Sequence, residues 1–287
     1  MTNDQLTQAI VNFTSIAQSM TEADLNRPWD WKGYEEGLRF IFFRTYEGLQ
    51  ELAARLETAR LASGRPLTTA QRILAQFHAA YLDLQAILIG VTGEQFEQPP
   101  AQGEWPVREA LAHIVQADRG FFASLCYGLE RLRTGDGRPE EMSEEYWNAF
   151  WAGHLFKDIS EQGTPAEIQD YHQALHVRIL GDFQDITDAE LGSPIRYWEG
   201  EPMTVEFRLH RFDSHMRQHT IQIEKTLAAI GAAPGEAKIL LRMIYRALAG
   251  VEGGLLGEDG IGLDQRNSLA AEINSWTDEM RSLLAKS

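Results

Sequence analysis

Apolar side chains recur every three or four residues along four stretches of the chain, a periodicity typical of helices that bury one face. The stretches lie at about 69–93, from Pro106 to about 133, from Thr164 to about 184, and at about 204–230. Alternating runs of β-branched and polar residues are few. The sequence therefore predicts a fold that is nearly all helix.

Two of these helices begin with a capping-box pattern, at Thr68–Gln71 and at Thr164–Glu167. Pro106 stands in the first turn of a third helix, where its missing N–H costs no hydrogen bond. Four amphipathic helices predict a four-helix bundle with room for a site in its interior. The link at about 134–163 is too long for a simple turn and is rich in aromatic residues, so we expect it to cap one end of the bundle.

The composition restricts the partners and the compartment. A chain of 287 residues with 44% hydrophobic content can form one large domain or two modest ones. The formal net charge of −16 repels nucleic acid and anionic lipid surfaces, so we expect neither as a partner. The first residues lack a secretory pattern, and no apolar run reaches the roughly 20 residues that span a bilayer, which predicts a cytoplasmic protein.

Cys126 is the single cysteine of the chain. With one cysteine the chain can form neither an internal disulfide nor a cysteine-rich zinc cluster, so a metal would have to be held by His, Asp or Glu. The sequence also lacks a nucleophile elbow, a phosphate-binding glycine loop and a dinucleotide fingerprint. Covalent serine chemistry and nucleotide dependence are therefore disfavoured.

The chain contains a weak internal repeat. Thr21–Leu25 (TEADL) matches Thr187–Leu191 (TDAEL), Arg72–Leu74 (RIL) matches Lys238–Leu240 (KIL), and both pairs are 166 residues apart. The repeat predicts that residues 1–62 copy the third and fourth bundle helices and that residues 236–287 copy the first and second. With one residue of slip, Gly48 and Leu52 correspond to His215 and His219, so the second copy lacks that histidine pair.

Two arrangements follow from the repeat. In the one we favour, residues 66–231 form the complete bundle, and residues 1–62 and 236–287 pack together as a second, degenerate bundle. A pseudo-dimer within one chain predicts a monomer in solution, with a homodimer as the alternative. In the other arrangement, the terminal helices lengthen or sheathe the main bundle.

Three histidines lie on the inward stripes of two predicted helices. His215 and His219 are spaced i, i+4, which stacks two imidazoles on one helix face, and His113 faces inward from a neighbouring helix. Three imidazoles can hold one metal ion and leave a coordination position open. Burying them together without a cation or acidic groups among them would cost desolvation free energy.

The residues around these histidines resemble a known family. Trp105–Ile114 (WPVREALAHI) followed by Asp213–Ile223 (DSHMRQHTIQI) is similar to the DinB/YfiT superfamily of metal-binding bundle proteins, and the resemblance covers about 66–231. It implies a four-helix bundle whose second helix supplies one histidine and whose fourth supplies a His-x-x-x-His pair. The implied ligands of a divalent metal, zinc or nickel, are His113, His215 and His219.

The resemblance also implies a class of chemistry. The family includes thiol-dependent S-transferases and a mycothiol-dependent isomerase, so we expect a small-molecule substrate and, as a candidate partner, a low-molecular-weight thiol. Neutral imidazoles leave the metal its full charge, which lowers the pKa of a bound water or thiol and permits hydrolysis or thiol transfer. The competing hypothesis is a non-catalytic, stress-related bundle that binds a small apolar ligand, with the metal absent or structural.

Four further residues lie within a turn of a candidate ligand. Glu109, Gln116 and Gln222 are candidates to support the ligands or to act as acid or base. Arg211 lies one turn before His215 and could bind a substrate carboxylate or phosphate; a buried ion pair with Glu109 or Asp118 is the alternative.

The remaining histidines have structural interpretations. His172 and His176 also form an i, i+4 pair, but only His172 lies on the inward stripe and no third ligand is evident. We expect both to be structural, and we expect His78 to serve in packing. His154 and His210 belong to no such pattern.

Overall fold

The computed structural model describes residues 4–153, 156–197 and 201–286, which form two compact units. Unit 1 comprises Met1–Leu67, Leu82–Gly90 and Ala233–Ser287, and unit 2 comprises Thr68–Tyr81 and Val91–Ala232. The secondary structure is helical apart from two short hairpins, which confirms the predicted all-α class. No described helix is both long and apolar enough to cross a membrane.

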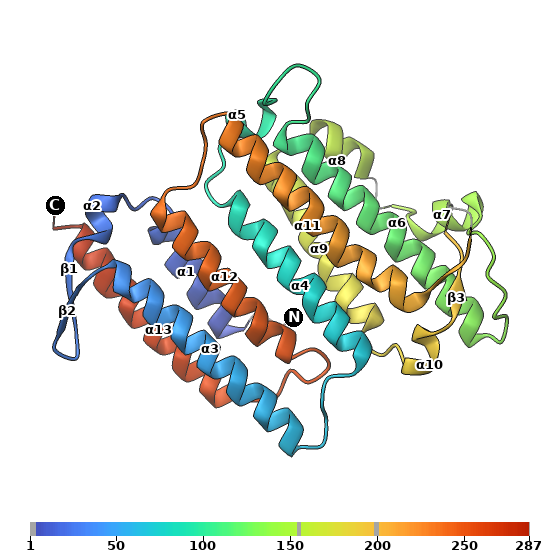
Figure 1. Cartoon of the computed structure of the whole chain (residues 1–287), viewed down its shortest axis with the longest axis horizontal. Coiled ribbons are helices and arrows are strands. Elements are labelled where there is room, and N and C mark those ends of the chain that lie inside the picture. Colours follow the sequence, from blue (N-terminus) through green and yellow to red (C-terminus); the bar gives the residue numbers. More distant parts are fainter. Residues whose placement is uncertain (1–3, 154–155, 198–200, 287) are drawn as a thin grey trace. The chain divides into compact units, whose positions relative to one another are not determined.

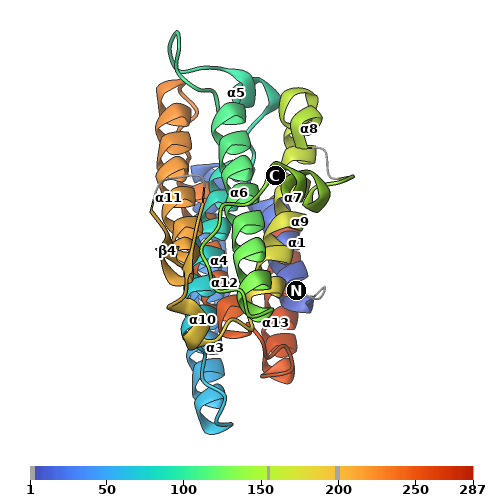
Figure 2. The same ribbon diagram turned by 90° about the vertical axis from the view of Figure 1, so that its right-hand side faces the viewer.

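Four long helices build unit 2 (Figures 1 and 2). They are α4 (Thr69–Leu88, of which unit 2 contains the part up to Tyr81), α6 (Val107–Arg133), α9 (Pro165–Phe183) and α11 (Val205–Ala229). Helix α6 packs against both α9 and α11. Phe77, Phe122, Phe183 and Phe212 are fully buried among these helices and form much of the core.

Local signals set the helix ends. The Thr164 side chain accepts from the N–H of Glu167 and the Glu167 carboxylate accepts from the N–H of Thr164, so the predicted capping box forms at the start of α9. Helix α4 ends at Leu88, five residues before the predicted end at 93. Gly90 is the reason, because its φ of 66° is left-handed and terminates the helix. Short helix α5 (Gly93–Glu97) then begins from its own cap, Thr92.

A small hairpin precedes the helix that carries the histidine pair. Strands β3 (Pro194–Ile195) and β4 (Met203–Thr204) are antiparallel and follow the short helix α10 (Asp188–Leu191). Ile195 packs so closely on α6 that a Cβ on Gly128 would lie 2.5 Å from its Cγ2. The Thr204 hydroxyl caps α11 by accepting from the N–H of Phe207. The hairpin therefore fixes the start of α11 relative to α6.

The long link between α6 and α9 contains two further helices, α7 (Glu144–Phe150) and α8 (Phe156–Gln162). Trp151 packs on Phe122, and the guanidinium of Arg119 lies 4.4 Å from the centroid of the Trp151 ring. Phe122 and Arg119 both lie midway along α6. The link therefore covers the side of the bundle, and the prediction that it caps one end is wrong. Cation–π and aromatic contacts, which sequence spacing does not reveal, decide its course.

Unit 1 has its own helical core. Helices α1 (Gln5–Ala17), α3 (Arg39–Ala62), α12 (Glu236–Gly254) and α13 (Leu263–Leu284) pack with α1 against α13 and α3 against α12. The Phe13 and Phe42 rings meet edge to face with centroids 5.0 Å apart. Asp83 in the α4 part of this unit is bound by Arg242 at 2.7 Å and by Arg246 at 2.6 Å.

Both units contain the same succession of elements. Unit 1 has α1, then α2 (Glu22–Leu25), the hairpin β1 (Pro28–Trp31) and β2 (Tyr34–Gly37), then α3; unit 2 has α9, α10, the β3–β4 hairpin and α11. In unit 1 the N–H of Leu38 donates to the carbonyl of Arg27. In unit 2 the N–H of Val205 donates to the carbonyl of Ser193 in the same way. The internal duplication and the three-part domain division remain predictions, and this shared order supports the first of them.

Candidate metal centre

The three predicted histidines converge in unit 2. His113 comes from the second turn of α6, and His215 and His219 come from successive turns of α11. These helices pack directly on each other. One nitrogen from each imidazole lies within 4.8 Å of the other two. Among the described residues, this is the one group of three or more His, Cys, Asp or Glu side chains placed so that they could hold a metal ion.

The spacing of the nitrogen atoms fits a shared ion. The Nε2 atoms of His113 and His215 are 3.1 Å apart. Two imidazoles bound to one tetrahedral ion at about 2.0–2.1 Å would hold their nitrogens about 3.4 Å apart, so this pair would need to shift by only a few tenths of an ångström. His215 and His219 are buried and His113 is more exposed, which leaves one side of the cluster open.

The surroundings keep two of these imidazoles neutral. Burial, with smaller effects from the neighbouring His219, His113 and Arg211, lowers the pKa of His215 to about 3. Burial and His219 also lower the pKa of His113. Neutral imidazole is the form that binds a metal ion. No carboxylate belongs to the described cluster, so its three candidate ligands are all imidazoles.

Gln222 is in contact with a candidate ligand. Its Oε1 lies 2.8 Å from Nδ1 of His219. Because an amide oxygen can only accept, this contact requires the proton of His219 to be on Nδ1 and leaves Nε2 free for a metal. Among the described residues, Nδ1 of buried His215 has no hydrogen-bond partner.

The other predicted supporting residues lie farther from the ligands. Glu109 and Gln116 are exposed, and Gln116 accepts from Arg119 at 3.1 Å. Arg211 lies near His215 and forms neither of the two ion pairs named as alternatives above. Asp118 is bound to His172 instead, and Glu109 has no described ion-pair partner. Glu109 and Gln116 thus have no described contact with the histidines.

Two aromatic residues contact the cluster, and their sequence positions did not predict this role. The Trp105 ring centroid lies 5.1 Å from that of His113 and 6.3 Å from that of His219. Phe121 meets His215 edge to face at 5.7 Å. Trp105 opens the motif that contains His113, and its 37% exposure places it at the open side.

A second histidine cluster lies in the core of unit 2. Nδ1 of His78 lies 2.9 Å from Nε2 of His176, and Nε2 of His172 lies 3.2 Å from Oδ2 of Asp118. All four side chains are at most 1% exposed, so the prediction that His176 lies off the inward stripe is wrong. Helix α9 is contacted by α4 as well as α6, which widens its buried face. His210 is exposed, and His154 lies outside the described residues.

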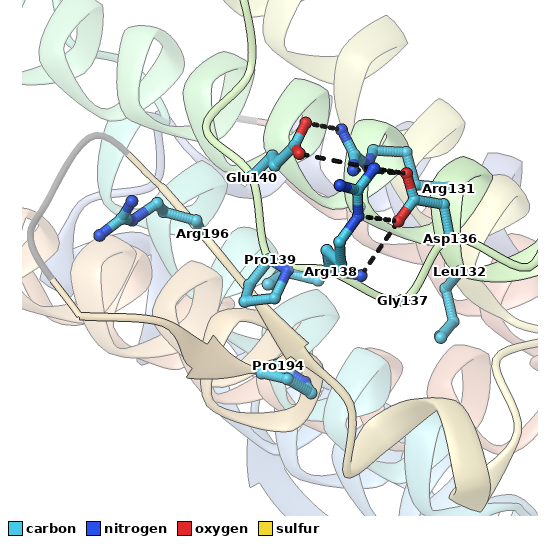
Figure 3. Close-up of a pocket in the computed structure, with 11 residues that line it drawn as sticks. Arg131, Leu132, Asp136, Gly137, Arg138, Pro139, Glu140, Pro194 and Arg196 are labelled. Carbon is cyan, nitrogen blue, oxygen red and sulfur yellow. Dashed lines mark hydrogen bonds and ion pairs between the residues drawn. The ribbon is translucent and has the colours of Figure 1, made fainter.

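Two cavities lie away from the histidines. One of about 10 Å³ beside β3 is lined by an ion-pair network in which Arg131 and Arg138 both bind Asp136 (Figure 3). Glu140 also pairs with Arg131, and the volume of the cavity is about that of one water molecule. The other, an open groove of about 240 Å³ in unit 1, is lined by Gly48, Leu52 and Leu269 among others.

Comparison with known protein families identifies the family of the chain. The model of the DinB superfamily matches residues 76–223, just over half of the chain. The chain belongs to the DinB superfamily. The matched region contains all three converging histidines, and in this DinB superfamily protein they lie on α6 and α11 as the resemblance of the sequence implied. Comparison with curated proteins and with solved structures gives no significant match.

Proposed function

We propose that this DinB superfamily protein is a metal-dependent enzyme in which His113, His215 and His219 hold one divalent ion, zinc or nickel. The observation that carries the proposal is the convergence of three imidazole nitrogens from two helices within 4.8 Å. Two of these imidazoles have lowered pKa values, so a cation would meet little competition from protons.

The residues around the ion would have distinct tasks. Bound by three neutral ligands, a divalent ion supplies Lewis acidity that lowers the pKa of a water or thiol towards about 7. Gln222 holds the tautomer and ring orientation of His219 through Nδ1. Phe121 restricts the position of His215, and Trp105 covers His113 and His219 from the exposed side.

Hydrolysis and thiol transfer are the reactions that this arrangement supports. Both need one open position on the ion and an approach from solvent, and the more exposed His113 side supplies that approach. The substrate that we propose is a small molecule, with a low-molecular-weight thiol as nucleophile or co-substrate.

Ligand replacement tests the proposal. Elemental analysis of His215→Ala after purification and zinc titration should give less than one tenth of the metal bound by the wild type, because removal of one of three ligands leaves an incomplete site. His210→Ala is the matched control, since His210 is an exposed histidine on the same helix. The enzyme proposal fails if the wild type neither contains metal nor acquires it on titration.

A further inference from the structure

Arg211 and His215 share one aromatic neighbour. The Cζ of Arg211 lies 5.8 Å from the centroid of the Phe121 ring, and that ring meets His215 edge to face. Arg211 precedes His215 by one helical turn and is half-buried. A permanent positive charge therefore lies at the edge of the candidate metal centre.

This arginine has no carboxylate partner among the described residues. Its one described hydrogen bond is to Oγ of Ser214, at a long 3.4 Å. The acidic side chain two residues along, Asp213, binds Arg217 at 2.6 Å. Three other arginines of unit 2 are held by carboxylates: Arg108 by Glu97, Arg131 by Asp136, and Arg133 by Glu190.

The charge of Arg211 is opposite in sign to the net charge of the molecule. The chain has a net charge of −16, so its average surface repels anions. At the histidine cluster the described metal-binding side chains are all imidazoles, and Arg211 adds positive charge without a counter-ion. A guanidinium presents paired donors that match a carboxylate.

We propose that Arg211 binds a carboxylate of the substrate while a second donor of the same molecule reaches the ion held by the three histidines. The proposal rests on the proposed function and names the class of its substrate: a small acid with a thiol or another metal-seeking group a few bonds from the carboxylate. Phe121 would form the apolar surface between the two polar contacts.

A first experiment tests Arg211 without metal. Chelator-treated wild type is titrated with sodium acetate, with sodium chloride at equal ionic strength as reference, while the arginine Nε–H resonances are followed by NMR. The Arg211 signal is assigned by its loss in Arg211→Gln. A saturable shift of this signal by acetate beyond that caused by chloride supports the proposal, and equal shifts by the two salts overturn it.

A second experiment tests the two-point contact in zinc-loaded protein. Calorimetry compares mercaptoacetate with 2-mercaptoethanol, which lacks the carboxylate. Arg211→Gln should weaken mercaptoacetate binding by about 10-fold or more and leave 2-mercaptoethanol binding unchanged, because a charged hydrogen-bonded pair is lost. Arg217→Gln, which changes an exposed arginine on the same helix, is the control.

The outcomes separate the two proposals. The role of Arg211 is overturned if zinc-loaded Arg211→Gln and Arg217→Gln lose mercaptoacetate affinity equally, or if Arg211→Gln loses none. The proposed function would stand in either case, because both variants still bind zinc. If zinc does not load at all, the proposed function fails, and the acetate titration of the metal-free protein decides the role of Arg211.

Discussion

At the scale of single residues, the orientation of His219 depends on one amide. The Oε1 of Gln222 is 2.8 Å from Nδ1 of His219 and fixes the proton there. Gln222→Ala should therefore raise the dissociation constant for zinc by about 10- to 100-fold, as the loss of a hydrogen bond to a ligand usually does. Competition titration with a chromophoric chelator measures this constant.

Gln218→Ala is the matched control for that measurement, because Gln218 is an exposed glutamine on the same helix. Its dissociation constant for zinc should equal that of the wild type. An unchanged constant in Gln222→Ala would mean that the contact does not orient the ligand.

A buried histidine makes the stability of the fold depend on pH. Burial holds the pKa of His176 well below 6.5, with smaller effects from His78 and His172. Below about pH 6.5 the unfolded chain therefore takes up a proton at this position that the folded protein does not bind. The contribution of His176 to the free energy of unfolding falls by about 2 kcal/mol between pH 6.5 and pH 5. Above that range the contribution is fully present. The raised pKa of buried Asp118 acts in the opposite direction.

Denaturant unfolding of the chelator-treated protein at about pH 7.5 and about pH 5 measures this dependence. His176→Asn should lose less stability over the interval than the wild type, even if it is less stable at both pH values. His210→Asn should lose as much as the wild type, because His210 is exposed. Equal losses in wild type and His176→Asn would refute the assignment.

The sequence predicted the convergence of the candidate ligands and missed the second cluster, for one physical reason. His113, His215 and His219 follow from helical spacing on two helices that pack together. The contact between His78 and His176 depends on how α4 is rotated against α9, and no local pattern specifies that rotation. The same holds for Trp105, whose ring reaches the histidines from a loop.

At the scale of elements, the β3–β4 hairpin links α6 to α11. Gly128→Ala should destabilise unit 2 by about 1–3 kcal/mol, because the new Cβ would meet the branched side chain of Ile195 at 2.5 Å. Gly181→Ala on α9 is the matched control, since a Cβ there meets nothing within 4 Å. The control should be neutral or stabilise by up to about 1 kcal/mol. Denaturant unfolding checks both, and a Gly128→Ala variant as stable as the wild type would contradict the close packing.

The long helices of unit 2 could be predicted because each has an apolar stripe, and α9 begins at Pro165 as its capping box predicts. The hairpin could not, because strands of two residues such as Pro194–Ile195 are too short for alternation to show. The helices within the link before α9 were missed for a related reason: aromatic packing and cation–π contacts with α6 fix them more than their own sequence does.

At the scale of the whole molecule, we infer that the two units descend from one scaffold and that one copy has lost its histidines. Matching the hairpin hydrogen bonds of Leu38 and Val205 aligns Gly48 with His215 and Leu52 with His219. These unit 1 residues line an open groove and cannot bind a metal. A chain that contains both copies needs no second subunit, so sedimentation velocity should give a monomer across micromolar concentrations. A tight dimer would contradict the pseudo-dimer interpretation.

X-ray absorption of the zinc-loaded wild type tests the central claim most directly. A stoichiometry of one ion per chain is expected, with scattering from three imidazole nitrogens at about 2.0–2.1 Å. A site that is filled by carboxylates or sulfur without imidazole, or a protein that binds no ion at stoichiometric zinc, would contradict the claim that His113, His215 and His219 form a metal centre.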